Sequence, residues 1–172
     1  MIEVVALATD EYIASIPALA GLLVDAVAGG ASVNFVASVT PEDAAAWWRG
    51  RVPLVANGTI SAFVARRDGD VVGSTLVIRS RNQNSPHRAE IGKVLVHRSV
   101  RRRGIGRQLM DAAEALARAD GRWMLMLDTQ AGSDADSFYR SLGWNAFGTM
   151  PNHAYTAAGV LAPTTFFWKD LR

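Results

Sequence analysis

Residues 94–110 read Val94-Leu95-Val96-His97-Arg98-Ser99-Val100-Arg101-Arg102-Arg103-Gly104-Ile105-Gly106-Arg107-Gln108-Leu109-Met110. The stretch begins as an apolar strand, passes through a basic turn that contains two glycines, and ends with the apolar spacing of a helix. A strand that enters a helix through such a turn points free backbone N–H groups at one spot, and the helix dipole adds partial positive charge there. We therefore predict that the turn binds a phosphate group. Arginine side chains that suit phosphate oxygens surround it, namely Arg98, Arg101, Arg102, Arg103 and Arg107.

The glycine spacing separates this turn from two other phosphate-binding loops. The dinucleotide fingerprint G-x-G-x-x-G requires a third glycine, and the chain has Leu109 there. The nucleotide-binding loop G-x-x-x-x-G-K-[ST] requires a lysine, which the turn lacks. What remains is the pattern R-x-x-G-x-G, filled by Arg101, Gly104 and Gly106. A solvated arginine cluster on an ordinary surface turn is the alternative interpretation.

Composition limits the classes of protein to consider. The 172 residues can bury a sizeable core, and we expect a single domain over residues 1–172. The chain has no cysteine and three scattered histidines, so we expect no disulfide and no metal site. Its N-terminus lacks the basic region of a secretory signal, and the apolar stretch 16–28 is interrupted by Asp25, so we expect a cytoplasmic protein that does not contact membranes. The net charge is only +2, and local clustering of the basic residues favours a small anionic ligand over nucleic acid.

Local patterns predict an α/β fold with elements in the order β-α-α-β-β-β-α-β-α-β-β. Helices are expected over residues 10–28, from Thr40 with Pro41 in the first turn, over 104–119 and over 133–142. Strands are expected over 1–8, 60–66, 71–78, 89–96, 122–127, 144–148 and 164–169. This order predicts a mixed central sheet of about seven strands flanked by about four helices.

The order of elements, with the strand–RxxGxG–helix unit just after the middle, resembles the GNAT acetyltransferase superfamily. A second match is the segment Ser137-Phe138-Tyr139-Arg140-Ser141-Leu142-Gly143-Trp144, which resembles the superfamily's A-x-x-x-Y-x-x-x-G-F segment. The resemblance implies the GNAT fold and an acetyl-CoA-dependent transfer of an acetyl group to an amine, with no metal. It also makes a homodimer one expectation, because GNAT enzymes are often dimers.

The resemblance implies where acetyl-CoA binds. The pantetheine arm would lie beside the strand that ends in Val94, Leu95 and Val96. The pyrophosphate would lie on the turn and the start of the helix, against Arg101, Arg102, Arg103, Gly104, Ile105, Gly106 and Arg107. Many members have an asparagine seven residues before the motif tyrosine, where this chain has Gly132. Contact from that loop is then expected from its backbone or from Ser133.

Three residues are candidates for the chemistry. Tyr139 matches the GNAT tyrosine near the sulfur of CoA, and a phenol with a pKa of ~10 can donate a proton to a thiolate at neutral pH. Glu90 lies fourteen residues before Gly104, which is the spacing of the catalytic glutamate in histone-acetylating members. Asp128 ends the strand expected to diverge from the cofactor strand, at an edge where ligands bind in open α/β sheets. An ion pair of Glu90 with a basic neighbour and a capping role for Asp128 are the alternatives, so the base stays undecided between them.

A narrower resemblance, to the tabtoxin-resistance acetyltransferases, is carried by residues 29–33, 88–90 and 127–133. It implies that Asp128 and Tyr139 are the catalytic pair. It also implies a small primary amine as acceptor, either amino-acid-like or an antibiotic or toxin similar to tabtoxinine-β-lactam. Asn34 and Phe35 are expected to line the acceptor side. A protein or peptide N-acetyltransferase and a CoA-binding sensor without turnover are the alternatives.

Overall fold

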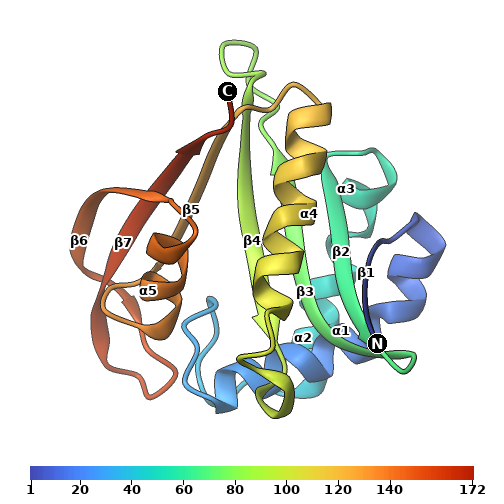
Figure 1. The fold of residues 1–172 in the computed structure, drawn as a ribbon. Helices are drawn as coiled ribbons and strands as arrows, with labels where there is room; N and C mark the ends of the chain where they lie inside the picture. The colour runs from blue at the N-terminus through green and yellow to red at the C-terminus, as the bar shows by residue number, and fades with distance from the viewer.

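The computed structural model describes residues 1–172 and consists of a seven-stranded sheet with helices on both faces (Figure 1). The strands are β1 (Ile2–Ala6), β2 (Ile60–Arg67), β3 (Asp70–Arg79), β4 (Arg88–Val96), β5 (Met124–Gln130), β6 (Asn145–Tyr155) and β7 (Leu161–Asp170). The helices are α1 (Thr9–Ala28), α2 (Pro41–Arg49), α3 (Val52–Ala56), α4 (Ile105–Ala119), α5 (Asp134–Ser141) and the short 3₁₀ helix η1 (Arg98–Val100). The strand order is β1-β2-β3-β4-β5-β7-β6.

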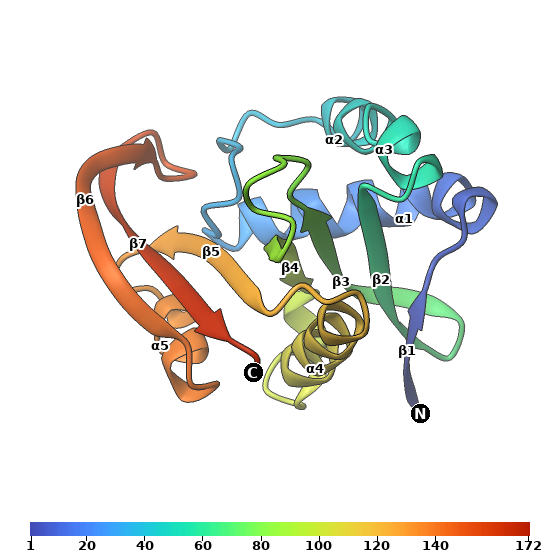
Figure 2. The ribbon, with the colours of Figure 1, turned by 90° about the horizontal axis from the view of Figure 1, so that it is seen from above.

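The helices divide between the two faces of the sheet. Figure 2 shows α1, α2 and α3 on one face and α4 and α5 on the other. The first layer forms a core around Tyr12, Leu23 and Trp48, and the second forms a core around Leu109 and Phe167; all five side chains are fully buried. The sheet is thus covered on both sides, as a mixed sheet with buried strands requires.

Local sequence explains two of the predicted elements directly. The Thr40 side chain accepts the Asp43 N–H at 3.1 Å, and the Asp43 carboxylate accepts the Thr40 N–H at 3.0 Å, so the two residues cap α2 reciprocally. Pro41 follows in the first turn, where its missing N–H costs nothing. Asp68 and Gly69 both have positive φ, as a two-residue hairpin turn between β2 and β3 requires.

The expected α/β fold with a mixed seven-stranded sheet is confirmed, with α1, α2, α4 and α5 as the four longer helices. The sequence patterns missed the five-residue helix α3 and the helix η1, which are too short to show a period. The predicted strands over 144–148 and 164–169 are also shorter than β6 and β7. Phe167 on β7 is fully buried in the core that α4 covers.

Helix α1 is longer than the apolar stretch that the sequence first indicates. By length and composition alone it is the one helix able to cross a membrane, and half of its apolar window is buried against the protein. Its buried side chains include Ile16, Leu19 and Leu23, which pack in the core on the sheet. The core helix of a globular protein passes the same test, so α1 is accounted for by this packing.

The central feature for function is the separation of β4 from β5. These parallel strands pair only where Arg88–Glu90 lie beside Met124–Met126. Beyond that point β4 stays with β3, whereas β5 stays with β7 along its whole length. The two strands therefore move apart toward their C-terminal ends, and the facing edge of each is left without a strand partner (Figure 1).

Candidate active site

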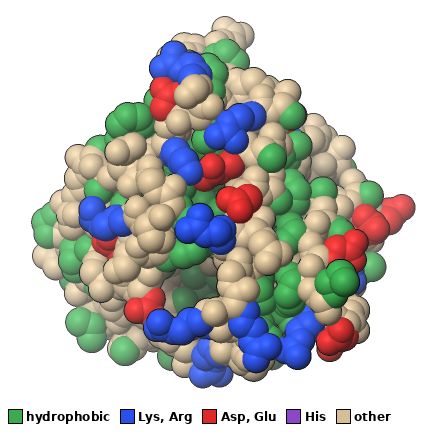
Figure 3. Space-filling view, in the orientation of Figure 1, with side chains coloured by type: hydrophobic (Ala, Val, Ile, Leu, Met, Phe, Trp, Pro, Cys, Tyr) green, Lys and Arg blue, Asp and Glu red, His purple; other side chains and the backbone are tan.

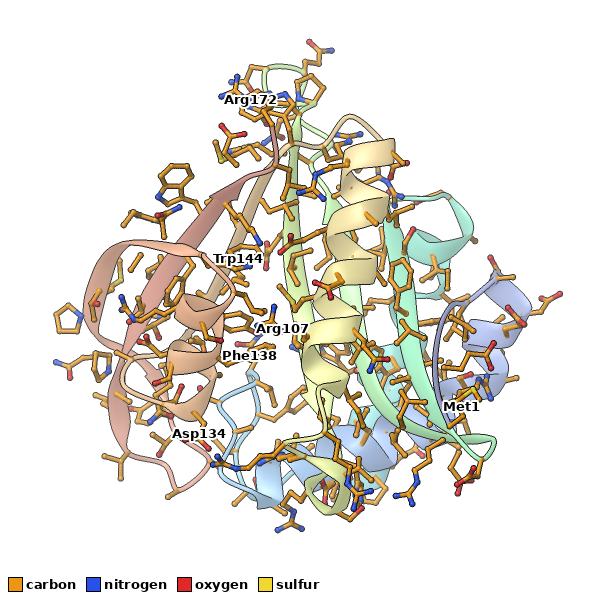
Figure 4. The ribbon with its side chains drawn as sticks, viewed as in Figure 1. Met1, Arg107, Asp134, Phe138, Trp144 and Arg172 are labelled. Atoms are coloured by element: carbon orange, nitrogen blue, oxygen red, sulfur yellow. The ribbon has the colours of Figure 1, made fainter.

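The turn after β4 lies at the open end of this separation. Gly104 precedes α4 with φ of 77°, a conformation that a side chain would strain. Gly106 serves close packing instead, because a Cβ there would lie 3.1 Å from the ring of Phe138 on α5. Figure 4 shows Arg107 and Phe138 on the facing sides of α4 and α5. The two glycines thus set the shape of the turn and the approach of the two helices.

Basic side chains surround the turn, and Arg101, Arg102, Arg103 and Arg107 are all exposed. Figure 3 shows Lys and Arg gathered along the lower edge of the face, below the start of α4, with a hollow above them. Arg101 donates to the carbonyl of Val96 at 3.1 Å, which folds its side chain back toward β4. Arg98 is not available in the same way, because it donates to Asp25 of α1 from its side chain at 2.9 Å and from its backbone at 3.0 Å. The turn therefore combines free N–H groups of a helix start with mobile positive charge.

A bulge in β4 redirects the strand next to the opening. The register with β3 shifts between Ser74 and Leu76, opposite Lys93, which has φ of 49°. The Ser74 hydroxyl donates to the Lys93 carbonyl at 3.0 Å and so fixes the bulge. A bulge of this kind bends a strand and turns side chains toward a new direction.

Charged side chains of β4 and β5 come together beside the bulge. Burial, together with the charge of Asp128, raises the pKa of Glu90, and Lys93 partly opposes that shift. Burial and the nearby Arg51 lower the pKa of Lys93 to about 8, against the attraction of both carboxylates. Two carboxylates and two cations from separate elements therefore act on one another at the point where the strands diverge.

Tyr139 lies on the α5 side of the same opening. Its ring packs against Phe138, Trp144 and Phe167, with centroids 5.4 to 6.2 Å apart. Burial and the charge of Asp128 raise the pKa of Tyr139. The phenol is therefore held in its protonated form and close enough to β5 to sense the Asp128 carboxylate.

The far side of the opening is formed by aromatic and cationic residues. The guanidinium of Arg51 lies 3.7 Å from the ring centroid of Trp47, and the ammonium of Lys93 lies 4.5 Å from it. Phe35 packs edge-on against the same ring at 6.3 Å. Adjacent Trp48 is fully buried in the core, and its ring meets that of Trp47 edge to face, with the centroids 4.9 Å apart.

Asn34 and Phe35 line a cavity of about 500 Å³ between the α1–α2 segment and the end of β6. Its other lining residues are Ser32, Val36, Ser38, Val39, Asp43, Ala154 and Tyr155. The Ala37 N–H donates to the Ala157 carbonyl at 2.9 Å, so the segment is tied to the β6–β7 turn. The volume is in the range of small-molecule sites.

Residues 31–144 match the family model described as the acetyltransferase (GNAT) family. The chain belongs to this family. It is an N-acetyltransferase, and its family uses acetyl-CoA. The expected membership is thereby confirmed.

Solved structures agree with this GNAT assignment. An N-acetyltransferase from Staphylococcus aureus Mu50 is 20% identical with a TM-score of 0.80, and the match covers 100% of this chain and 99% of that one. The ribosomal-protein-alanine N-acetyltransferase from Brucella melitensis is 25% identical with a TM-score of 0.76, over 99% of each chain. The structure of yncA from Salmonella typhimurium, 20% identical with a TM-score of 0.77 over 100% of this chain and 95% of that one, contains its cofactor acetyl-CoA.

The loop between β5 and α5 of this GNAT enzyme is held from within. Ser133 caps α5 by accepting the Asp136 N–H at 3.2 Å and donates to the Gln130 carbonyl at 2.7 Å. Asp136 is buried and accepts the Gly132 N–H at 3.1 Å and the Thr165 hydroxyl at 2.9 Å. The first turn of α5 is therefore packed against β7 at Asp136. The Ser133 hydroxyl and the N–H groups of Ala131, Gly132 and Ser133 are thus all hydrogen-bonded within the protein.

The fold brings the three predicted candidates Glu90, Asp128 and Tyr139 to one opening. The sequence analysis did not single out Arg51 or Lys93, whose charges act on one another beside it. Lys93 did carry a signal, because a lone lysine in the apolar strand that leads to Val94 is unusual. Arg51 gave no such signal in the sequence, because an arginine just after the end of a helix is usually a solvated residue.

The lowered pKa of Lys93 can be measured, because the chain has only one other lysine, Lys169. After reductive ¹³C-methylation, we expect the Lys93 signal in an NMR titration to change with a midpoint near pH 8. Lys169 bonds both oxygens of Glu114 at 2.8 and 2.9 Å and serves as the internal reference. Lys93→Arg identifies the signal, and a midpoint near the ordinary lysine value of ~10.4 would contradict the burial described.

Proposed function

We propose that this GNAT enzyme transfers the acetyl group of acetyl-CoA directly to the primary amine of a small molecule, and that residues 1–172 act as a single domain. One observation carries the proposal. Glu90, Asp128 and Tyr139, from three separate elements, converge where β4 and β5 separate, and the phosphate-binding turn ends the same β4 strand. A held thioester, a base and an acid are what acyl transfer to an amine requires.

The residues fit acetyl-CoA from its phosphates to its thioester. Gly104, with its positive φ and no side chain, leaves the start of α4 accessible, and the first N–H groups of this helix suit a pyrophosphate. The edge of β4 that faces β5 offers unpaired peptide groups to the pantetheine arm. The proposed contacts are the backbone at Val94, Leu95, Val96, Gly104, Ile105 and Gly106, the arginines 101, 102, 103 and 107, and the loop at Ser133.

The proposed reaction has one nucleophile, one base and one acid. The base removes a proton from the ammonium of the acceptor, and the neutral amine attacks the thioester carbonyl. The C–S bond then breaks as the C–N bond forms, and CoA leaves as a thiolate. Tyr139 donates its proton to that thiolate, a role for which its protonated state at neutral pH is suited.

Glu90 and Asp128 remain the two candidates for the base. Glu90 is favoured by its raised pKa, because a base works best when its pKa lies near the operating pH. Asp128 is favoured by the resemblance to the tabtoxin-resistance acetyltransferases and by its influence on Tyr139. We assign the proton transfer to Glu90 and a supporting charge to Asp128.

A small acceptor is supported by the cavity of about 500 Å³ that Asn34 and Phe35 line. The resemblance of residues 29–33, 88–90 and 127–133 to the tabtoxin-resistance enzymes extends this to an amino-acid-like amine, an antibiotic or a toxin. A peptide N-terminus is the second candidate, because the 25% identical neighbour from Brucella melitensis is named for acetylating a ribosomal-protein alanine.

We also propose a homodimer, with β6 as its contact surface. This edge strand is exposed along nearly its whole length and carries Phe147, Met150 and Tyr155, all more than half exposed. Sedimentation velocity measures the state directly, and a single species of 18.5 kDa would refute it.

Release of free thiol from acetyl-CoA tests the proposed function. The acceptors are tabtoxinine-β-lactam, aminoglycosides, amino acids, polyamines and peptides with free N-termini. We expect turnover of one class of small amine. Turnover of peptides alone would favour the second candidate, and CoA binding without thiol release from any acceptor would favour a CoA-binding sensor and contradict the proposal.

The role of the turn can be separated from backbone strain by a matched pair of variants. Gly104 and Gly58 have φ of 77° and 74°, and a Cβ at either meets no atom within 4 Å. We expect Gly104→Ala and Gly58→Ala to lose similar stability, about 1 kcal/mol, because both force the same left-handed conformation. Only Gly104→Ala should weaken binding of CoA, measured by isothermal titration calorimetry. Equal CoA affinity in the two variants would place the phosphate site elsewhere.

The pH dependence of kcat/KM distinguishes the two carboxylates. Because its pKa is raised above the ordinary value of 4.5, the Glu90 carboxylate takes up a proton at a higher pH than an ordinary glutamate does. As the solution is made more acidic, we therefore expect kcat/KM to fall already at a pH above that value. Glu90→Gln should lose this acidic limb and about 100-fold or more in rate. Asp128→Asn should keep the limb but move it to lower pH, since the Asp128 charge helps to raise the pKa of Glu90. The reverse pattern would assign the base to Asp128.

A further inference from the structure

Arg51 is a half-buried cation for which the protein supplies no carboxylate. Burial lowers the pKa of Arg51, Tyr12 opposes that shift, and no carboxylate contributes to it. Its only hydrogen bond runs from Nη1 to the carbonyl of Trp47, at 3.1 Å. A guanidinium has five N–H donors, so most of them have no acceptor in the protein. Buried charge of this kind is costly unless something pairs with it.

Lys93 adds a second cation on the same aromatic ring. Its ammonium and the Arg51 guanidinium both lie over Trp47, and Arg51 is the charge that disfavours protonation of Lys93. Neither residue forms an ion pair with a carboxylate within 4.0 Å. At pH 7 Lys93 is still mostly charged, since its pKa is about 8. Two neighbouring positive charges without an anion between them are the usual makeup of an anion-binding site.

The opposite charge lies across the opening. Glu90 and Asp128 come from β4 and β5, and both attract Lys93. The opening is therefore negative on its strand side, beside the phenol of Tyr139, and positive on its α2 side, at Arg51. A ligand with an ammonium and a carboxylate a few atoms apart would match both sides at once.

We infer that Arg51 and Lys93, held over Trp47, bind a carboxylate of the acceptor, and that the acceptor is an α-amino acid or a close analogue. The inference rests on the proposed function for the identity of the site, and it names the chemical class that the site selects. Arg51 is then a specificity-determining residue. Its fork is suited to a carboxylate, and Trp47 fixes its orientation. Phe35, packed against Trp47, places the cavity of about 500 Å³ next to this subsite for the acceptor's side chain.

The test compares L-amino acids with their amides, which keep the amine and lose the carboxylate charge. For the wild-type enzyme we expect kcat/KM to favour the acids by about 10- to 100-fold, through KM, as loss of a charge-assisted hydrogen bond predicts. Arg51→Gln should abolish most of this preference, so that acids and amides are used with similar kcat/KM. Arg51→Lys should restore part of it. Arg49→Gln is the matched control, because Arg49 is exposed, ends α2 two residues before Arg51 and pairs with Glu42.

A binding experiment tests the subsite without turnover. In the presence of CoA, N-acetyl-L-amino acids should raise the Tm of the wild-type enzyme more than the corresponding N-acetyl-amino acid amides, and Arg51→Gln should remove the difference. Equal use of acids and amides, together with equal Tm shifts, would overturn the inference and leave the N-acetyltransferase proposal intact. Acid-selective Tm shifts that depend on Arg51, with no thiol released from any amine, would support the subsite and refute the proposed reaction.

Discussion

The structure depends on one constraint, which is that β4 and β5 remain paired for only three residues of each strand. On one side β4 is held by β3, and on the other β5 is held by the hairpin of β7 and β6. Each strand therefore keeps its stability from its outer neighbour while its inner edge stays open. Peptide groups on these inner edges lack a strand partner, and in the proposed complex the extended arm of acetyl-CoA supplies one. The opening is thus a consequence of how the sheet is paired, and the site follows from it.

The charges in the opening are arranged by the same separation. Glu90 ends the paired part of β4, Lys93 stands in the bulge beyond it, and Asp128 lies on β5 where the strands have parted. Burial and the charge of Asp128 raise the pKa of Glu90, and Lys93 only partly opposes that shift. Charges left in this state destabilise a fold slightly and are typical of functional sites. Lys169 of β7 and Glu114 of α4, in contrast, form an ion pair that joins the two elements.

The family of this chain and much of its site could be predicted from the sequence because those features are local. The turn at Gly104 requires a glycine, the α2 cap requires Thr40, and the tyrosine motif occupies one short helix. The remaining features involve residues far apart in the chain. Arg51 reaches Lys93 only because α2 packs against α1, which lies on the sheet beneath it. No pattern within a window of residues predicts such a meeting.

The sequence by itself determined the order of the elements, the glycine turn before α4 and the three candidate catalytic side chains, since short-range spacing, capping and backbone conformation decide them. Only the tertiary structure decided that Asp136 is buried, that Arg98 is held by Asp25, and that Arg51 and Lys93 both lie over Trp47. Burial and pairing are properties of surfaces brought together by packing. The same arginine is solvated, structural or ligand-binding according to the neighbours that the fold gives it.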